Sequence, residues 1–171
     1  TEMIVWGGYD NSSHVNTGGR YDPWGDNWTA TSTGPTVPTG RPGHTAVWSQ
    51  ERGEMIVWGG HYRDARDQTL NTGGCYNPST DSWTATIASL TRRWDHTAVW
   101  TGTEVIIWGG VGDIGVLNTG GRYTPATDSW VPTSTGANVT AARQQHQAVW
   151  TGTEMIVWGG SSDFDQLNTG G

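Results

Sequence analysis

Ile107-Trp108-Gly109-Gly110 is one of four copies of the same short motif, and the distance between the copies decides the fold. The other three copies end at Gly8, Gly60 and Gly160, so the spacings along the chain are 52, 50 and 50 residues. A fixed period of about 50 residues is typical of a propeller or a solenoid, in which each repeat is one structural unit. The sequence therefore predicts a repeat protein.

Further features recur in phase with this motif. Asn-Thr-Gly-Gly follows each double glycine, a Tyr comes next in three of the copies, and a Trp stands seven positions after that Tyr. An Arg-x-x-His segment and an Ala-Val-Trp segment then complete the period. The Tyr and Trp positions are Tyr21/Trp28, Tyr76/Trp83 and Tyr123/Trp130, and the Arg and His positions are Arg41/His44, Arg93/His96 and Arg143/His146.

Double Gly, then Tyr, then six residues, then Trp is the kelch signature. The chain resembles kelch repeats over essentially its full length, and most of all the Trp- and Thr-rich kelch arrays of large bacterial proteins. The resemblance implies an all-β propeller with one four-stranded antiparallel blade per repeat, in a ring of six or seven blades. It also implies that the repeated Tyr and Trp pack between neighbouring blades. It implies no single activity, since propellers host binders, scaffolds and a few enzymes.

The residues of each repeat also indicate four short strands. In the repeat around Trp108 we expect an inner strand at 96–100 and a second strand at 104–108, whose β-branched residues suit burial on both faces. The third and fourth strands are expected at 118–123 and 129–133. Regular turn signals between such short strands fit a propeller blade and leave no room for a helix.

The chain holds three periods and a 19-residue overlap, because residues 1–19 align with residues 153–171. The first blade lacks its inner strand and the last lacks its outer strand. Open edge strands template unwanted pairing. We therefore expect either continuation into further blades, which we favour, or self-association. The predicted units are a partial blade at 1–40, blades at 41–92 and 93–142, and a partial blade at 143–171.

Composition excludes several classes of partner. All nine basic residues are Arg, and the net charge of −7 argues against binding a phosphate backbone. No apolar run reaches the roughly 18 residues of a membrane-spanning helix, so we expect no membrane insertion. The absence of Lys, the richness in Thr, Ser and Gly, and the likeness to bacterial arrays favour a place in the cell envelope or outside the cell.

Binding residues are expected in the loops that follow each double glycine, because these loops differ between repeats. Strands alternate in direction, so these loops share one face with the segments that enter the inner strands. The second repeat has a three-residue insertion there and carries residue types enriched at binding hot spots. The alternative is that these loops vary because nothing packs on them. The candidates are His61, Tyr62, Arg63 and Arg66, then Phe164 in the last loop, with Arg41, Arg93 and Arg143 nearer the channel.

The repeated Arg-x-x-His segments have two interpretations. A ring of Arg and His around the channel could hold an anionic ligand, with bidentate contacts from Arg. Alternatively, Arg and His bond backbone carbonyls at the blade junctions, which satisfies groups that would otherwise be buried unpaired. Repetition in every blade favours the structural interpretation, because architecture repeats whereas sites usually do not.

An enzymatic alternative comes from the galactose-oxidase family, which also uses a kelch-type propeller. Its copper site needs Tyr and His ligands and a thioether between Tyr and Cys. Cys75 is the only cysteine, and its neighbour Tyr76 is expected to point to the opposite side of the strand, so this pair cannot crosslink. Asp163-x-Asp165 and Asp64-x-x-Asp67 lack the spacing of a calcium-binding EF-hand loop.

The sequence therefore predicts a binding or structural module, with a protein partner on the loop-rich face and no catalytic residue, metal or cofactor. One alternative is a lectin-like propeller, in which Tyr9, Tyr62 and Phe164 stack on sugars. The other is the propeller of a galactose-oxidase-like copper enzyme.

Overall fold

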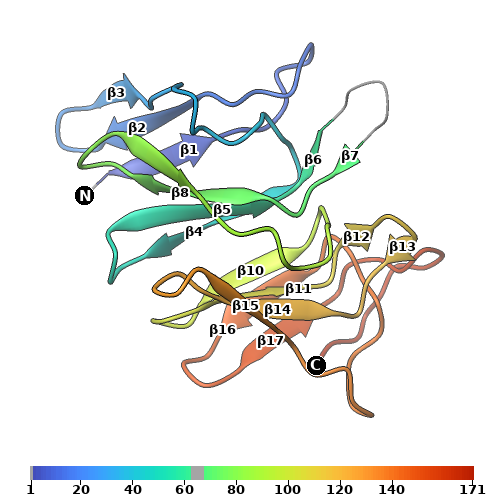
Figure 1. Cartoon of the computed structure of the whole chain (residues 1–171). Helices are drawn as coiled ribbons and strands as arrows, with labels where there is room; N and C mark the ends of the chain where they lie inside the picture. Colours follow the sequence, from blue (N-terminus) through green and yellow to red (C-terminus); the bar gives the residue numbers. More distant parts are fainter. Residues whose placement is uncertain (1, 63–67) are drawn as a thin grey trace.

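The computed structural model describes residues 2–62 and 68–171, and all of its regular elements are β-strands. Six antiparallel sheets form, two of which are small hairpins; the other four follow one another along the chain, as Figure 1 shows from blue to red. We name them blades A to D. Blade A is β1 (Met3–Trp6), β2 (Gly18–Asp22) and β3 (Asn27–Ala30). Blade B is β4 (His44–Ser49), β5 (Glu54–Gly59), β8 (Gly73–Asn77) and β9 (Ser82–Ala85).

Blade C repeats the order of blade B, with β10 (Thr97–Trp100), β11 (Val105–Trp108), β14 (Gly120–Thr124) and β15 (Ser129–Pro132). Blade D has two strands, β16 (Gln147–Trp150) and β17 (Met155–Trp158). The predicted four-stranded antiparallel blades are confirmed, and the strands of blade C lie within about two residues of the predicted ranges. No helix in the described part of the chain is long and apolar enough to cross a membrane.

Consecutive residues of each strand alternate between two faces, and blades B and C are packed on both. We call the face toward the preceding blade the trailing face and the opposite one the leading face. In blade B, the trailing residues Met55, Val57, Tyr76 and Trp83 form one buried cluster with Trp6 of blade A. The leading residues Ile56, Trp58 and Cys75 join Val105, Ile107 and Tyr123 of blade C in a second cluster.

The expected packing of Tyr and Trp between blades is confirmed. The Trp83 ring lies 5.1 Å from Tyr76 within its blade and 5.0 Å from Trp6 of the preceding one. Trp130 repeats this arrangement and lies 5.0 Å from Trp58. Each buried aromatic side chain removes roughly 150–250 Å² from water, which helps to compensate for a chain in which only 33% of residues are hydrophobic.

In blades B and C, an aspartate in the turn before the fourth strand adds a polar link to the preceding blade. The Tyr76 hydroxyl donates to Asp81 Oδ1 at 2.6 Å, and the same oxygen accepts the N–H of Ser32 from blade A at 2.9 Å. These hydrogen bonds, that from Tyr76 first, lower the pKa of Asp81. In blade C, Asp128 binds Tyr123 and the N–H of Ile87 in the same way. The sequence indicated only a turn here, because the second partner comes from another repeat.

The double glycine is required by positive φ and by close approach of the next blade. Gly59 has φ 70°, and a Cβ there would lie 2.6 Å from Cε1 of His96 and 2.8 Å from the carbonyl oxygen of Arg93. Gly60 has φ 95°, and its Cβ would lie 2.7 Å from the carbonyl oxygen of Pro42. A side chain at either position would therefore push the segment entering an inner strand out of place.

We expect Gly59→Ala to lower the free energy of unfolding by about 2 kcal/mol or more, from the left-handed backbone and the contact with the next blade. Gly34→Ala is the matched control, since Gly34 has ordinary φ and no atom within 4 Å of an added Cβ. Urea unfolding of both variants measures the difference. Equal stability of the two variants would contradict the required approach of blades B and C.

Candidate binding surface on the loop-rich face

One face of the molecule combines the loops after each double glycine with the segments that enter the inner strands, as expected. The described parts of these loops lie toward the right-hand side of Figure 1. Small hairpins form there, namely β6 (His61–Tyr62) with β7 (Gln68–Thr69) and β12 (Val111–Gly112) with β13 (Gly115–Val116).

Backbone hydrogen bonds fix these hairpins to the entering segments. Trp94 and Val111 exchange two such bonds, of 3.0 and 2.8 Å, and Gln144 and Ser161 do the same in the last repeat. The N–H of His61 donates to the carbonyl of Pro42 at 3.0 Å. The loop bases are thus part of the hydrogen-bonded scaffold, which favours precise presentation of the side chains that they carry.

Five rings from three repeats form a continuous row on this face. Tyr9 and His14 lie on the loop of blade A, His61 and Tyr62 on β6, and Trp94 on the segment entering blade C. Ring centroids are 5.6 Å apart for Tyr9 and His14, 5.2 Å for His14 and His61, and 4.9 Å for His61 and Trp94. Tyr62 lies 5.9 Å from His14. We call these five residues the aromatic–histidine row.

A shallow cavity of about 240 Å³ lies at one end of the row, lined by Tyr9, Ser12, Ser13, His14 and Tyr62. Asp10 shapes its rim, because its Oδ1 accepts the N–H groups of Ser13 at 2.7 Å and Ser12 at 2.9 Å. These bonds, that from Ser13 first, lower the pKa of Asp10 to about 2, so the carboxylate is ionised at neutral pH. The cavity therefore offers ring faces beside hydroxyl groups.

The predicted binding residues fall into three groups. His61 and Tyr62 lie in the aromatic–histidine row, where the structure brings them together with residues of blades A and C. Phe164 is 92% exposed at a loop tip of the last repeat and makes no ring contact with the row among the described residues. Arg63 and Arg66 lie outside the described residues.

Three residues of this face were not selected from the sequence. His14 and Trp94 belong to the row, and Ile114 is 98% exposed at the tip of the β12–β13 hairpin. The sequence did offer a signal for all three, because each is an aromatic or apolar residue in a variable loop or in a segment that enters an inner strand. What the sequence could not show was that the loops of three repeats converge.

Arg41, Arg93 and Arg143 do not belong to this surface, because their exposures are 1%, 0% and 0%. Each guanidinium instead binds carbonyl groups of its own blade. Nη1 of Arg93 donates to the carbonyls of Gly109 at 2.9 Å and Thr119 at 2.6 Å. Burial lowers the pKa of Arg41 and Arg93 to about 10, which leaves both charged at neutral pH. These bonds agree with the structural interpretation of the repeated Arg, and the contact of Arg41, Arg93 and Arg143 with a partner stays a prediction.

The repeated His residues join neighbouring blades. Nε2 of His96 lies 2.9 Å from the Thr45 hydroxyl of blade B, and its ring meets Trp58 of that blade edge-on at 5.6 Å. His146 makes the same pair of contacts with Thr97 and Trp108 of blade C. These imidazoles therefore pack as part of the blade junctions, beside the buried guanidinium groups of the repeated motif.

Cys75 is a buried thiol whose environment differs from that of a copper-radical site. Its side chain lies in the cluster between blades B and C, whereas Tyr76 lies in the cluster between blades A and B. The expected opposite orientation of the two is confirmed. Burial raises the pKa of Cys75 to about 11, which disfavours the reactive thiolate. Within residues 2–62 and 68–171, no three His, Cys, Asp or Glu side chains gather as potential metal ligands.

Comparison with known proteins agrees with this architecture. Residues 1–169 match the family model described as KLHDC2/KLHL20/DRC7 Kelch-repeats domain. The chain belongs to the kelch-repeat family. Domains of this family generally mediate protein interactions and are generally not catalytic. A search of curated proteins finds no match. The bacterial source and the place outside the cell stay predictions.

We expect Arg93→Lys to lower the free energy of unfolding by about 2 to 4 kcal/mol, because a single ammonium cannot replace a buried guanidinium whose Nε donates to the carbonyl of Thr91 while its Nη1 donates to those of Gly109 and Thr119. Arg92→Lys is the matched control, since Arg92 is the adjacent residue and has an exposed ion pair with Asp113. Thermal or urea unfolding measures both. A loss of partner binding by folded Arg93→Lys, with unchanged stability, would contradict the structural role.

The buried imidazoles predict a loss of stability in mild acid. Burial lowers the pKa of His44 and His96, and lowers that of His146 to about 4. Below a pH of about 6.5 the unfolded chain binds protons that these folded imidazoles do not, so the free energy of unfolding falls as the pH drops. Urea unfolding at pH values of about 7 and about 5 should show this decline. Asp10→Asn should leave the decline unchanged, because the pKa of Asp10 lies below this range. A flat profile would contradict the neutral buried state.

Proposed function

We propose that this chain is a non-catalytic interaction module that binds a protein partner on its loop-rich face, through the aromatic–histidine row. The observation that carries this proposal is the convergence of five rings from three repeats on one face. Protein interfaces are enriched in Tyr and Trp at the positions that contribute most to affinity.

The scaffold beneath the row supports this function. Because the loop bases are hydrogen-bonded to the entering segments, less conformational entropy is lost when a partner binds. The exposed tips Ile114 and Phe164 add apolar contacts along the same face. With its net charge of −7, the chain is suited to a partner whose contact surface is neutral or basic.

A carbohydrate ligand is the second candidate, and the cavity lined by Tyr9, Tyr62, Ser12, Ser13 and His14 is the observation that favours it. Ring faces beside hydroxyl groups are suited to contact a sugar. A protein partner accounts for more of the surface, since the row continues beyond the cavity to His61 and Trp94.

Variants of the row test the proposal. Proteins captured from the source cells by the wild-type chain should be retained by Thr80→Ala and Thr103→Ala, which alter the opposite face. Tyr9→Ala and Tyr62→Ala should each weaken binding of the captured partner by more than about 1 kcal/mol, as expected of hot-spot residues. Calorimetry with the purified partner gives these differences.

A glycan array separates the two candidates. Selective glycan binding that is lost in Tyr62→Ala would replace the protein partner by a sugar. If Thr80→Ala and Thr103→Ala weakened binding of the partner more than the Tyr variants do, the assignment of the binding face would be wrong.

A further inference from the structure

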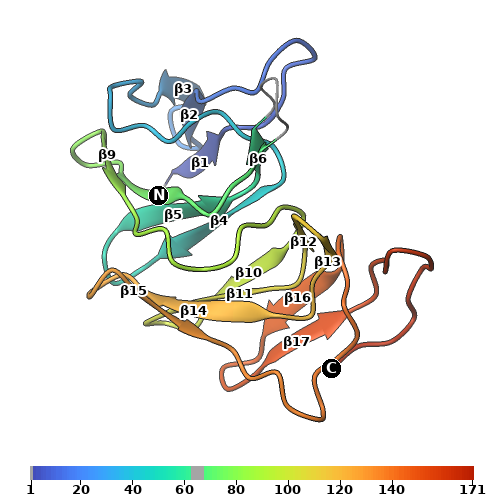
Figure 2. The same ribbon diagram turned by 45° about the vertical axis from the view of Figure 1, so that its right-hand side comes forward.

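The variable loop of blade A and the strand β6 of blade B enclose the cavity of about 240 Å³ on the loop-rich face. The loop contributes Tyr9, Ser12, Ser13 and His14 to the lining, and β6 contributes Tyr62. The two elements lie near each other in both views of the molecule (Figures 1 and 2). The cavity is therefore built at a junction between consecutive blades, and we call it the tyrosine pocket.

The two tyrosines of the pocket leave ring faces available to a ligand. The His14 ring crosses that of Tyr9 at 74° and that of Tyr62 at 72°, with centroids 5.6 and 5.9 Å apart. Because neither tyrosine stacks flat on His14, each keeps at least one ring face outside this contact. The face of an aromatic ring carries partial negative charge and attracts a cation.

The aspartate and serine groups at the rim of the pocket are arranged to accept hydrogen bonds. Oδ1 of Asp10 accepts the N–H groups of Ser13 and Ser12, so neither N–H is left to bind an anion. The Ser12 hydroxyl also donates to Oδ1, at 2.8 Å, which leaves its oxygen lone pairs as acceptors. Oδ2 of Asp10 accepts only the Ser13 hydroxyl within the described residues, at 3.4 Å. A ligand with several donors fits this rim, and a carboxylate or a phosphate does not.

The charges of the variable loops favour the same class of ligand. The described parts of these loops hold four aspartates and no Lys or Arg, namely Asp10, Asp113, Asp163 and Asp165. Residues 63–67 include two Arg and two Asp, whose formal charges cancel. Within 2–62 and 68–171, no basic side chain forms an ion pair with Asp10. The field of these loops therefore attracts a positively charged group.

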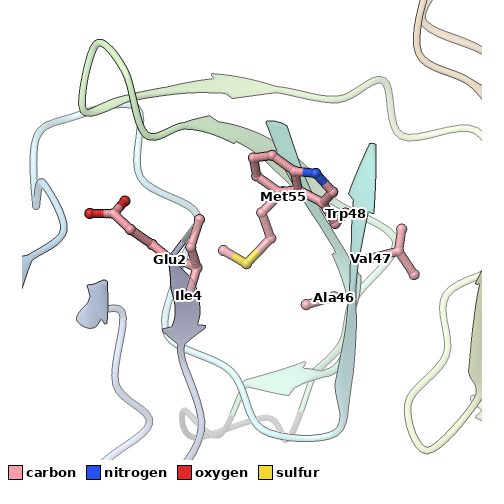
Figure 3. A pocket seen from close by; sticks show the side chains of 6 residues that line it. All are labelled: Glu2, Ile4, Ala46, Val47, Trp48 and Met55. Carbon is pink, nitrogen blue, oxygen red and sulfur yellow. The ribbon is translucent and has the colours of Figure 1, made fainter. Parts of the chain in front are cut away.

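A second cavity, of about 210 Å³ between β1 and blade B, lacks this combination (Figure 3). Its lining is largely apolar and includes Ile4 and Met55. Its one carboxylate, that of Glu2, points away from the Trp48 ring and lies 3.8 Å from Nη1 of Arg20. Of these two cavities, the tyrosine pocket is the one that places ring faces beside a carboxylate without a cationic partner in the described part of the chain.

We infer, on the basis of the proposed function, that the tyrosine pocket receives an arginine side chain of the protein partner, with the guanidinium against the rings of Tyr9 and Tyr62 and hydrogen-bonded to the Asp10 carboxylate. Arginine suits the pocket better than lysine, because its planar guanidinium stacks on aromatic rings and presents a fork of donors to a carboxylate. The volume lies below the about 300–1,000 Å³ of small-molecule pockets, which suits the end of one side chain.

Nuclear magnetic resonance with a short probe tests the pocket directly. Acetyl-Gly-Arg-Gly-amide is titrated into the isotope-labelled chain, and the matched probe has citrulline in place of arginine, which keeps the shape and removes the charge. The arginine probe should shift the amide signals of Ser12, Ser13 and Tyr62, with a dissociation constant of about 1 to 10 mM. The citrulline probe should bind at least about fivefold more weakly, because it loses the attraction of a cation to the rings and to the carboxylate.

Asp10→Asn tests the carboxylate, because the amide oxygen can still accept the N–H groups of Ser12 and Ser13 while the charge is removed. This variant should bind the arginine probe at least about fivefold more weakly than the wild type. Asp113→Asn is the matched control, since Asp113 is an exposed aspartate of another variable loop. Its dissociation constant should stay within about twofold of the wild type, because solvent screens a distant exposed charge. The amide spectrum of each variant shows whether the fold is retained.

Equal binding of the two probes, or no shift at the pocket amides, would overturn the arginine pocket. Unchanged binding of the arginine probe by folded Asp10→Asn would overturn the role of the carboxylate and with it the pocket as described. If Tyr62→Ala weakens binding of a captured partner while the arginine probe leaves the pocket unshifted, the proposed function stands and the arginine assignment fails. If the arginine probe binds the pocket but the captured partner binds through the opposite face, the proposed function fails.

Discussion

The contact between the double glycine of one blade and the Arg-x-x-His segment of the next is the constraint on which the rest of the structure depends. The N–H groups of Gly60 and Gly110 donate to the carbonyls of Arg93 and Arg143, each across a blade junction. The arginine side chain meanwhile ties the entering segment to its own blade. Since the backbone carbonyl and the side chain of the arginine are both hydrogen-bonded, each blade is fixed to its neighbour at the end that carries the variable loops.

This constraint explains why the loop-rich face combines constant and changeable residues. The arginine and histidine side chains of the repeated motif stabilise the fold, because Arg93 is fully buried and His96 packs against Trp58. In the proposed function, recognition falls to residues that the repeat does not fix, such as Tyr62 and His14. Hydrogen-bonded loop bases that carry variable ring side chains have the rigidity and the variability that an interaction surface needs.

The sequence predicted the blades well because each repeat carries its own strand and turn signals, and because Trp58 and Trp108 recur in phase. It also predicted that Cys75 and Tyr76 face opposite ways, which follows from strand geometry alone. The convergence of His14, His61 and Trp94 was not predictable, since it depends on how three loops approach one another in space. The hydrogen bond from Ser32 to Asp81 was missed for the same reason, because Ser32 belongs to another repeat.

Amide hydrogen exchange at the double glycines tests the central constraint most directly. If the blades are joined as described, the N–H groups of Gly8, Gly60 and Gly110 exchange as slowly as those of the central strands β5 and β11, because each donates to an arginine carbonyl of the next blade. Exchange of these amides at the rate of an exposed loop amide, such as that of Gly34, would show that the junctions open freely and would contradict the account.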